Sequence, residues 1–78
     1  MDRQNKSVII IFFNVKTGKQ EDLEVPLNIS ANELIKAIRT VYCLEGDYLK
    51  CENPIALLRG NKTLAEYGLH DGSMVIYS

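Results

Sequence analysis

The sequence is poor in the residues that build catalytic centres, metal sites and disulfide scaffolds. It contains one histidine, two cysteines and no tryptophan. Cys43 and Cys51 lack the CxxC spacing of a redox or zinc site and are too few for a disulfide framework, so we expect two buried, reduced thiols. Nine basic and ten acidic residues give a net charge of -1 without a basic stripe, which disfavours nucleic-acid binding.

Long apolar runs and targeting signals are also missing. No apolar run approaches the roughly 18 residues that would span a bilayer. The first six residues carry charges, but they are not followed by the apolar segment and cleavage site of a signal peptide. We therefore expect a cytoplasmic protein without direct membrane insertion. Residues 1–6 offer nothing to pack and are predicted to be a disordered lead-in, and residues 7–78 are predicted to form one small domain.

No catalytic constellation stands out in the sequence. His70 lies in a predicted turn, where an exposed structural histidine is favoured over a general base or a ligand. Neither a GxxxxGK nor a GxGxxG pattern is present to cradle a phosphate. The acidic residues Glu21, Asp22 and Glu24 are interpreted as a solvated strand face that blocks pairing. The sequence therefore predicts no enzyme activity and no cofactor or metal.

Residues 30–42 have the pattern of the one long helix. Ser30 and Glu33 have the spacing of a capping box, in which each side chain accepts a hydrogen bond from the backbone amide of the other. One apolar stripe at helical spacing follows, made of Leu34, Ile38, Val41 and Tyr42. A single stripe requires a single sheet to pack on.

The remaining segments supply the strands of that sheet. Residues 7–15 are almost continuously apolar, as in a strand covered on both sides, and residues 20–27 return after a turn as an alternating strand. Short strands are predicted over 48–52 and 55–58, a capped helical turn over 63–68 and a last strand over 73–78. The first and last strands should lie side by side in parallel. This order predicts an α+β fold, a β-grasp with a mixed sheet of about four to five strands and one long helix on one face.

The residues resemble ubiquitin over positions 9–78. The hairpin from Phe12 through Thr17-Gly18-Lys19 to Val25 resembles the first two strands of ubiquitin, and the segment from Asn61 to Leu69 resembles the segment before its last strand. Tyr67 stands where the resemblance implies a tyrosine whose hydroxyl locks a nearby loop to the backbone. The resemblance therefore implies the ubiquitin-like form of the β-grasp.

Two features of ubiquitin are absent from the sequence. Ubiquitin-like modifiers and sulfur carriers end in a flexible Gly-Gly tail, whereas this sequence stops at Ile76-Tyr77-Ser78 inside the predicted last strand. The apolar recognition patch that the resemblance implies is replaced by Lys16, Glu52 and Ser78. We therefore expect a protein that is not conjugated to others.

A narrower resemblance is to the YukD/EsaB type of small bacterial proteins found with type VII (WXG-type) secretion systems. It rests on Tyr48-Leu49-Lys50, Gly60, Leu64, Gly68-Leu69 and Asp71-Gly72. The resemblance implies a cytoplasmic accessory protein that binds a protein partner, such as a membrane component of the secretion machine. Two alternatives stay open: a generic ubiquitin-like interaction domain unrelated to secretion, and a truncated modifier or sulfur carrier.

Strand alternation predicts a binding surface on the sheet face opposite the helix. If Ile9, Ile11 and Phe13 face the helix, their neighbours in the first strand face away, together with alternate residues of the last strand. The predicted protein-interaction residues are Ile10, Phe12, Met74 and Ile76, with Lys50 at the rim. An apolar centre with a polar rim is typical of interfaces. Alternatively, the cluster reflects only β-propensity, is covered by residues 1–6, or pairs two copies as a homodimer.

Overall fold

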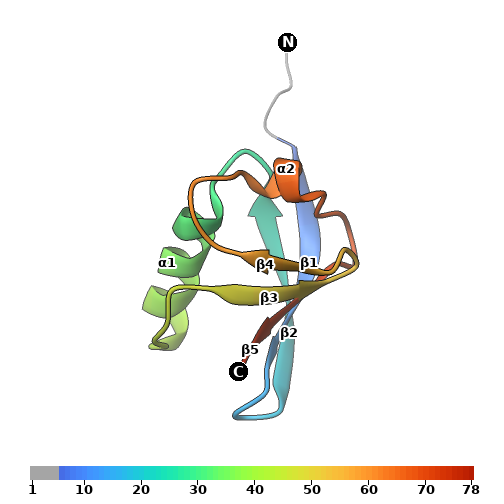
Figure 1. Ribbon diagram of the computed structural model, residues 1–78. Helices are drawn as coiled ribbons and strands as arrows, with labels where there is room; N and C mark the ends of the chain where they lie inside the picture. Colours follow the sequence, from blue (N-terminus) through green and yellow to red (C-terminus); the bar gives the residue numbers. More distant parts are fainter. Residues whose placement is uncertain (1–5) are drawn as a thin grey trace.

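The order of helices and strands along the chain is the predicted one (Figure 1). The computed structural model describes residues 6–78, so residues 1–5 of the predicted lead-in lie outside the described residues. The described elements are β1 (Ser7–Asn14), β2 (Lys19–Pro26), α1 (Ala31–Tyr42), β3 (Leu49–Glu52), β4 (Ala56–Leu58), α2 (Leu64–Tyr67) and β5 (Met74–Tyr77).

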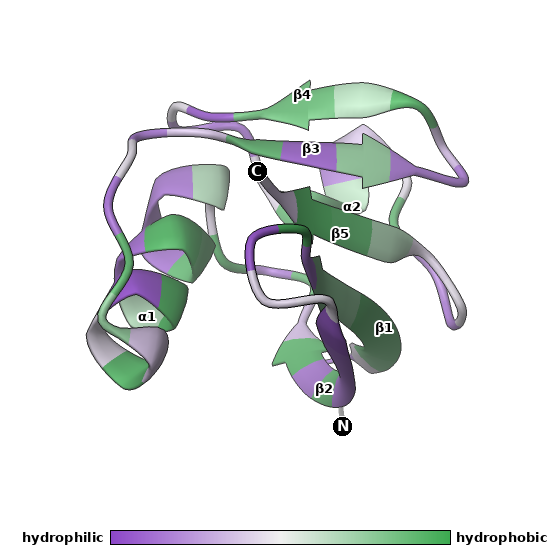
Figure 2. Ribbon diagram, turned by 90° about the horizontal axis from the view of Figure 1, so that it is seen from below, coloured by the Kyte–Doolittle hydropathy of each residue, from purple (hydrophilic) through white to green (hydrophobic). Residues whose placement is uncertain are grey.

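The five strands form one mixed sheet in the order β2-β1-β5-β3-β4. β1 pairs antiparallel with β2 and parallel with β5, which confirms the prediction that the first and last strands lie side by side. β3 pairs antiparallel with both β5 and β4. Helix α1 lies on one side of this curved sheet, and β1 and β5 in its middle are mostly hydrophobic (Figure 2). The sheet therefore has an inner face toward α1 and an outer face away from it.

Helix α1 begins where the capping box predicts. Ser30 Oγ accepts a hydrogen bond from Glu33 N at 3.1 Å, and Glu33 Oε1 accepts one from Ser30 N at 2.8 Å. The side chains that α1 buries are Ala31, Leu34, Ile35 and Ile38. Val41 was predicted to belong to this stripe but is 71% exposed, because it lies beside β2, where the sheet ends. The buried stripe is therefore displaced toward the first turns of the helix.

The hydroxyl of Tyr67 anchors the loop before α2. It donates a hydrogen bond to Arg59 O at 2.8 Å and accepts one from Arg59 N at 3.3 Å. The same short helix is held at its start by a capping box between Thr63 and Glu66. Hydrogen bonds from Thr63 hold the pKa of the Glu66 carboxyl below its usual value. The loop lock implied for Tyr67 is thus present.

Removing the Tyr67 hydroxyl should destabilise the protein. Tyr67→Phe is expected to lower the free energy of unfolding by about 1–2 kcal/mol, because both Arg59 backbone groups lose their partner. Urea denaturation followed by circular dichroism measures the change. Tyr48→Phe is the matched control, because Tyr48 is 45% exposed and its change should stay within about 0.5 kcal/mol. Equal losses in the two variants would contradict the lock.

The two cysteines lie in different environments. Cys51 is 2% exposed on β3, as predicted, whereas Cys43 is exposed, so the prediction of a buried thiol is wrong there. Cys43 terminates α1 in the left-handed conformation with a φ of 58° and therefore lies at the helix end rather than in the core. Burial, with a smaller contribution from the Glu52 carboxylate, raises the pKa of the Cys51 thiol to about 11.

This difference predicts selective alkylation. At pH 8 only about one thousandth of Cys51 would be thiolate, three units below its pKa of about 11. Iodoacetamide should therefore modify Cys43 first and reach Cys51 only after unfolding in urea. Peptide mass spectrometry over time measures both rates. Similar rates for the two thiols in the native protein would show that Cys51 is not buried.

Candidate protein-interaction face

The phase of β1 is opposite to the predicted one. Ile10 is fully buried and Phe12 is 2% exposed, whereas Ile9 is 49% exposed. Ile10 and Phe12 were predicted to be interaction residues on the outer face, and that prediction is wrong. Both side chains belong to the hydrophobic core under α1, and the Phe12 ring lies 5.0 Å from the Tyr42 ring.

The turn between β1 and β2 sets this phase. The residues between paired Asn14 and Lys19 are the four from 15 to 18, and this loop pairs Ile10 with Leu23. Directly paired residues point to the same face, so the inward side chain of Leu23 brings Ile10 inward as well. The apolar run of β1 has no period of two, and therefore only the loop length could have revealed its phase.

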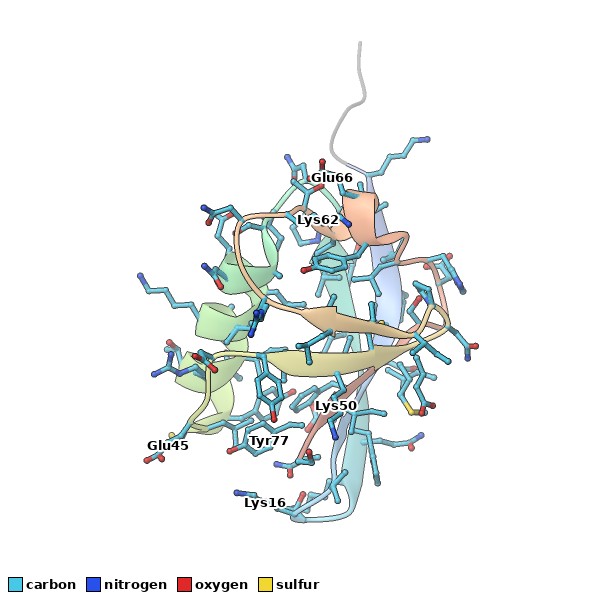
Figure 3. All side chains as sticks on the ribbon, viewed as in Figure 1. Lys16, Glu45, Lys50, Lys62, Glu66 and Tyr77 are labelled. Atoms are coloured by element: carbon cyan, nitrogen blue, oxygen red, sulfur yellow. The ribbon has the colours of Figure 1, made fainter. Side chains whose placement is uncertain are left out.

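The other three predicted residues lie on the outer face. Met74 and Ile76 are half-buried there, on either side of the fully buried Val75. Lys50 is exposed on β3 and pairs with Ile76. Figure 3 shows the Lys50 side chain projecting from the ribbon of β3. The structure thus brings Lys50, Met74 and Ile76 together, next to side chains of β1 that were predicted to face the helix.

The strand registers arrange the outer side chains in two rows across the sheet. One row is Gln20, Phe13, Ile76, Lys50 and Leu57. The other row is Asp22, Ile11, Met74 and Glu52. With Ile9, the apolar members form a cluster over β1 and β5, and Leu57 on β4 lies beyond Lys50 in the first row. We call the set Ile9, Ile11, Phe13, Leu57, Met74 and Ile76 the outer apolar face.

Charged side chains border the outer apolar face. Asp22 and Glu24 lie on the β2 side, and Lys50 and Glu52 lie on the β3 side. Glu24 also accepts a hydrogen bond from Ser7 Oγ at 2.7 Å, which fixes that carboxylate beside β1. The border therefore carries three carboxylates and one ammonium group, so its charge is predominantly negative at neutral pH.

The end of β5 is tied to two neighbouring loops. The Tyr77 hydroxyl accepts a hydrogen bond from Glu45 N at 3.4 Å, and Lys16 Nζ lies 5.5 Å from the centre of the Tyr77 ring. In Figure 3, Lys16, Glu45 and Tyr77 lie at the same end of the molecule. These contacts hold the hairpin turn and the loop after α1 against the last strand.

The remaining reactive side chains do not converge. His70 is exposed in the turn before β5, and its Nδ1 lies 2.9 Å from Asp71 O. Within residues 6–78, no group of three histidine, cysteine, aspartate or glutamate side chains is placed to hold a metal ion. None of the helices in that range has the length and apolar character needed to cross a membrane.

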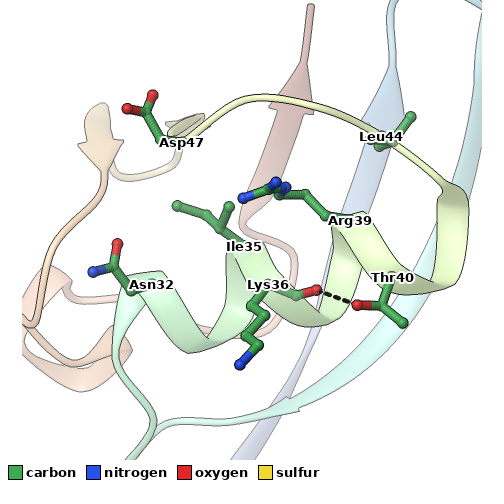
Figure 4. Close-up of a pocket in the computed structure, with 7 residues that line it drawn as sticks. All are labelled: Asn32, Ile35, Lys36, Arg39, Thr40, Leu44 and Asp47. Atoms are coloured by element: carbon green, nitrogen blue, oxygen red, sulfur yellow. Dashed lines mark hydrogen bonds between the residues drawn. The ribbon is translucent and has the colours of Figure 1, made fainter.

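An open hollow lies on the side of α1, between the helix and the loop after it (Figure 4). Its volume is about 530 Å³, and Lys36, Arg39 and Asp47 line it. Asn32 at its edge accepts a hydrogen bond from Gly60 N at 2.9 Å, and Thr40 Oγ1 donates one to Lys36 O at 2.9 Å. The hollow contains no pair of nucleophile and base.

Comparison with known proteins identifies the fold. No protein-family profile and no curated protein sequence matches the chain. The chain is similar to a ubiquitin-like domain of an Arabidopsis thaliana protein, with 18% identity, 91% of this chain and 74% of that chain covered and a TM-score of 0.73. It is also similar to the UBL domain of Plasmodium falciparum Dsk2, with 17% identity, 94% and 100% coverage and a TM-score of 0.70.

A third similar structure is a de novo designed protein based on ubiquitin. Its identity to this chain is 18%, with 90% of this chain and 84% of that chain covered and a TM-score of 0.70. At such identities the likeness concerns the fold alone. Together with the strand order and the capped helix, these comparisons confirm the predicted α+β architecture, and the chain has a ubiquitin-like β-grasp fold.

Proposed function

We propose that this protein is a non-conjugated ubiquitin-like adaptor that binds a protein partner through the outer apolar face. The observation that carries the proposal is the cluster of large apolar side chains on two adjacent strands, opposite α1 and bordered by charges. The largest exposed apolar patch of a small protein is often a functional surface. The role is therefore binding rather than catalysis, and it requires no cofactor.

The charges around the face define the chemistry of the partner. Asp22, Glu24 and Glu52 outnumber Lys50, so a complementary surface has apolar side chains at its centre and arginine or lysine at its margin. A second copy of this protein does not fit this description. Its border would carry the same predominantly negative charge, so two copies docked through this face would repel each other at their margins.

The proposed setting is bacterial type VII secretion, with the partner in the cytoplasmic part of the membrane machine. The support for this setting is the sequence pattern of the YukD/EsaB type, which includes Tyr48-Leu49-Lys50 and Asp71-Gly72. In the structure Lys50 belongs to the border of the outer apolar face. The pattern and the binding face therefore share one strand.

Affinity capture from native bacterial lysate tests the proposal. Wild-type protein is compared with Ile11→Asp/Met74→Asp, which places two carboxylates at the centre of the outer apolar face. The control is Lys36→Glu/Arg39→Glu in the hollow on α1, which adds two carboxylates at exposed positions away from the sheet face. We expect a component of the secretion membrane machine to be captured by the wild type and the control, and lost with the sheet-face variant.

Two results would contradict the proposal. Capture that survives in the sheet-face variant but fails in the α1 variant would move the binding site to the helix. A thioester with an activating enzyme, formed by a native gene product ending in Gly-Gly, would identify a modifier or sulfur carrier. A partner from another cellular system would retain the adaptor role and remove the link to secretion.

A further inference from the structure

β2 is a long free edge of the sheet. It pairs with β1 on one side, and no strand within residues 6–78 pairs with its other side. The edge at β4 is three residues long, whereas β2 has eight residues. A free edge of this length presents backbone donors and acceptors that can pair with another strand.

The pairing register identifies the free backbone groups. Leu27 N donates to Lys6 O at 2.9 Å, and antiparallel pairs alternate from that point, so the backbone groups of the odd-numbered residues 21–25 face β1. The N–H and C=O groups of Gln20, Asp22 and Glu24 therefore point to the open side. Pro26 has no N–H, so donors on this edge end at Glu24.

An apolar groove runs beside this edge, between β2 and α1. Leu23 and Val25 form one wall, Ala37 and Val41 contribute to the other, and the cavity volume is about 180 Å³. Val41 is the apolar helix residue that the core leaves 71% exposed. A strand added to β2 would place every second side chain over this groove, because side chains alternate across a sheet.

The other face of the same edge is acidic. The side chains of Asp22 and Glu24 point to the outer face, where they would lie next to the remaining side chains of an added strand. Glu21 points inward, where it accepts a hydrogen bond from the Tyr42 hydroxyl at 2.8 Å, so its carboxylate lies on the opposite face from Asp22 and Glu24. Like charges on adjacent strands are destabilising, so Asp22 and Glu24 disfavour pairing with β2 of a second copy and favour lysine or arginine.

We propose that the free edge of β2 and the groove beside α1 bind an extended segment of a partner protein in which aliphatic and basic residues alternate. The segment adds a strand to the sheet. Its backbone pairs with Gln20, Asp22 and Glu24, its aliphatic side chains fill the groove, and its basic side chains lie beside the carboxylates. Main-chain pairing supplies affinity and the alternating side chains supply specificity.

A synthetic peptide tests this site on the purified protein. The probe is the blocked heptapeptide Lys-Val-Lys-Val-Lys-Val-Lys, and its control is Glu-Val-Glu-Val-Glu-Val-Glu. Amide hydrogen exchange measured by NMR should slow about tenfold or more at Gln20, Asp22 and Glu24 with the lysine peptide. The acidic peptide should leave these rates unchanged.

Two charge reversals separate this edge from the rest of the outer face. Asp22→Lys is expected to weaken binding of the lysine peptide about tenfold, whereas Glu52→Lys, the same change on β3, should alter it less than about twofold. Val41→Asp tests the groove. It should fold, because Val41 is exposed, and it should lower the protection at Asp22.

Several results would overturn the proposal. Unchanged exchange at the edge amides with the lysine peptide at 1 mM or equal binding of both peptides would do so, as would equal effects of the two charge reversals. Protection that grows with protein concentration without peptide would show self-pairing instead. Because the peptide assay uses no cellular partner, its outcome is independent of the capture experiment on the outer apolar face.

Discussion

Ile10→Ala is expected to lower the free energy of unfolding by about 2–4 kcal/mol, whereas Ile9→Ala should lower it by less than about 1 kcal/mol. The two residues are neighbours in β1 and lose the same atoms. Ile10 is fully buried in the core, so its truncation leaves a cavity, while Ile9 is 49% exposed and leaves none. Urea denaturation followed by circular dichroism measures both variants.

A second neighbouring pair provides an internal control. Phe12→Ala should cost about 3–5 kcal/mol, because Phe12 is 2% exposed and packs on Tyr42. Phe13→Ala should cost less, because Phe13 is only half-buried on the outer face. Larger losses in the free energy of unfolding for Ile9 and Phe13 than for Ile10 and Phe12 would show that β1 has the opposite phase. Ile9, Ile11 and Phe13 would then not belong to the outer apolar face.

The second large effect is expected in binding. Ile11→Asp/Met74→Asp should weaken the affinity for the captured partner at least about 100-fold, because two desolvated carboxylates would replace the apolar centre of the interface. Ile11 and Met74 are directly paired across β1 and β5, so both changes fall on one spot. Isothermal titration with the purified partner measures the loss.

Two controls isolate this effect. Ile11→Val/Met74→Leu keeps the face apolar and should retain affinity within about threefold. Circular dichroism must show that the aspartate variant remains folded, which is expected because both side chains lie outside the core cluster. A folded aspartate variant with wild-type affinity would contradict the role of the outer apolar face.

Local sequence signals predicted those parts of the fold that depend on neighbouring residues. The capping box of Ser30 and Glu33 fixed the start of α1, because both partners lie three residues apart. The alternation of β2 correctly placed Leu23 and Val25 on the inner face, and Met74 and Ile76 were correctly placed on the outer one. In each case the signal lies within one element.

The phase of β1 could not be read in the same way. Every residue from Val8 to Phe13 is apolar, so either face could have been buried. The phase is fixed by the pairing of Ile10 with Leu23, which depends on a turn of four rather than three or five residues. Ile10 and Phe12 were misplaced for that reason. On the outer face, Ile11 and Phe13 occupy the places that were predicted for Ile10 and Phe12.

Exposure at the margins of the sheet also escaped prediction. Val41 has the correct helical spacing, but its exposure depends on where β2 ends the sheet. Leu57 joined the outer apolar face through its pairing with Lys50, which no local pattern in a three-residue strand indicates. Both features depend on the order of the strands, and that order becomes visible only in the assembled sheet.

Site-specific crosslinking detects whether the outer apolar face contacts the partner. The photoreactive residue p-benzoylphenylalanine is placed at Phe13, on the outer apolar face beside Ile76, or at Thr40, on the exposed side of α1. We expect a crosslink to the captured partner from position 13 and none from position 40. A crosslink from position 40 alone would place the partner on the helix and exclude the outer apolar face as its binding site.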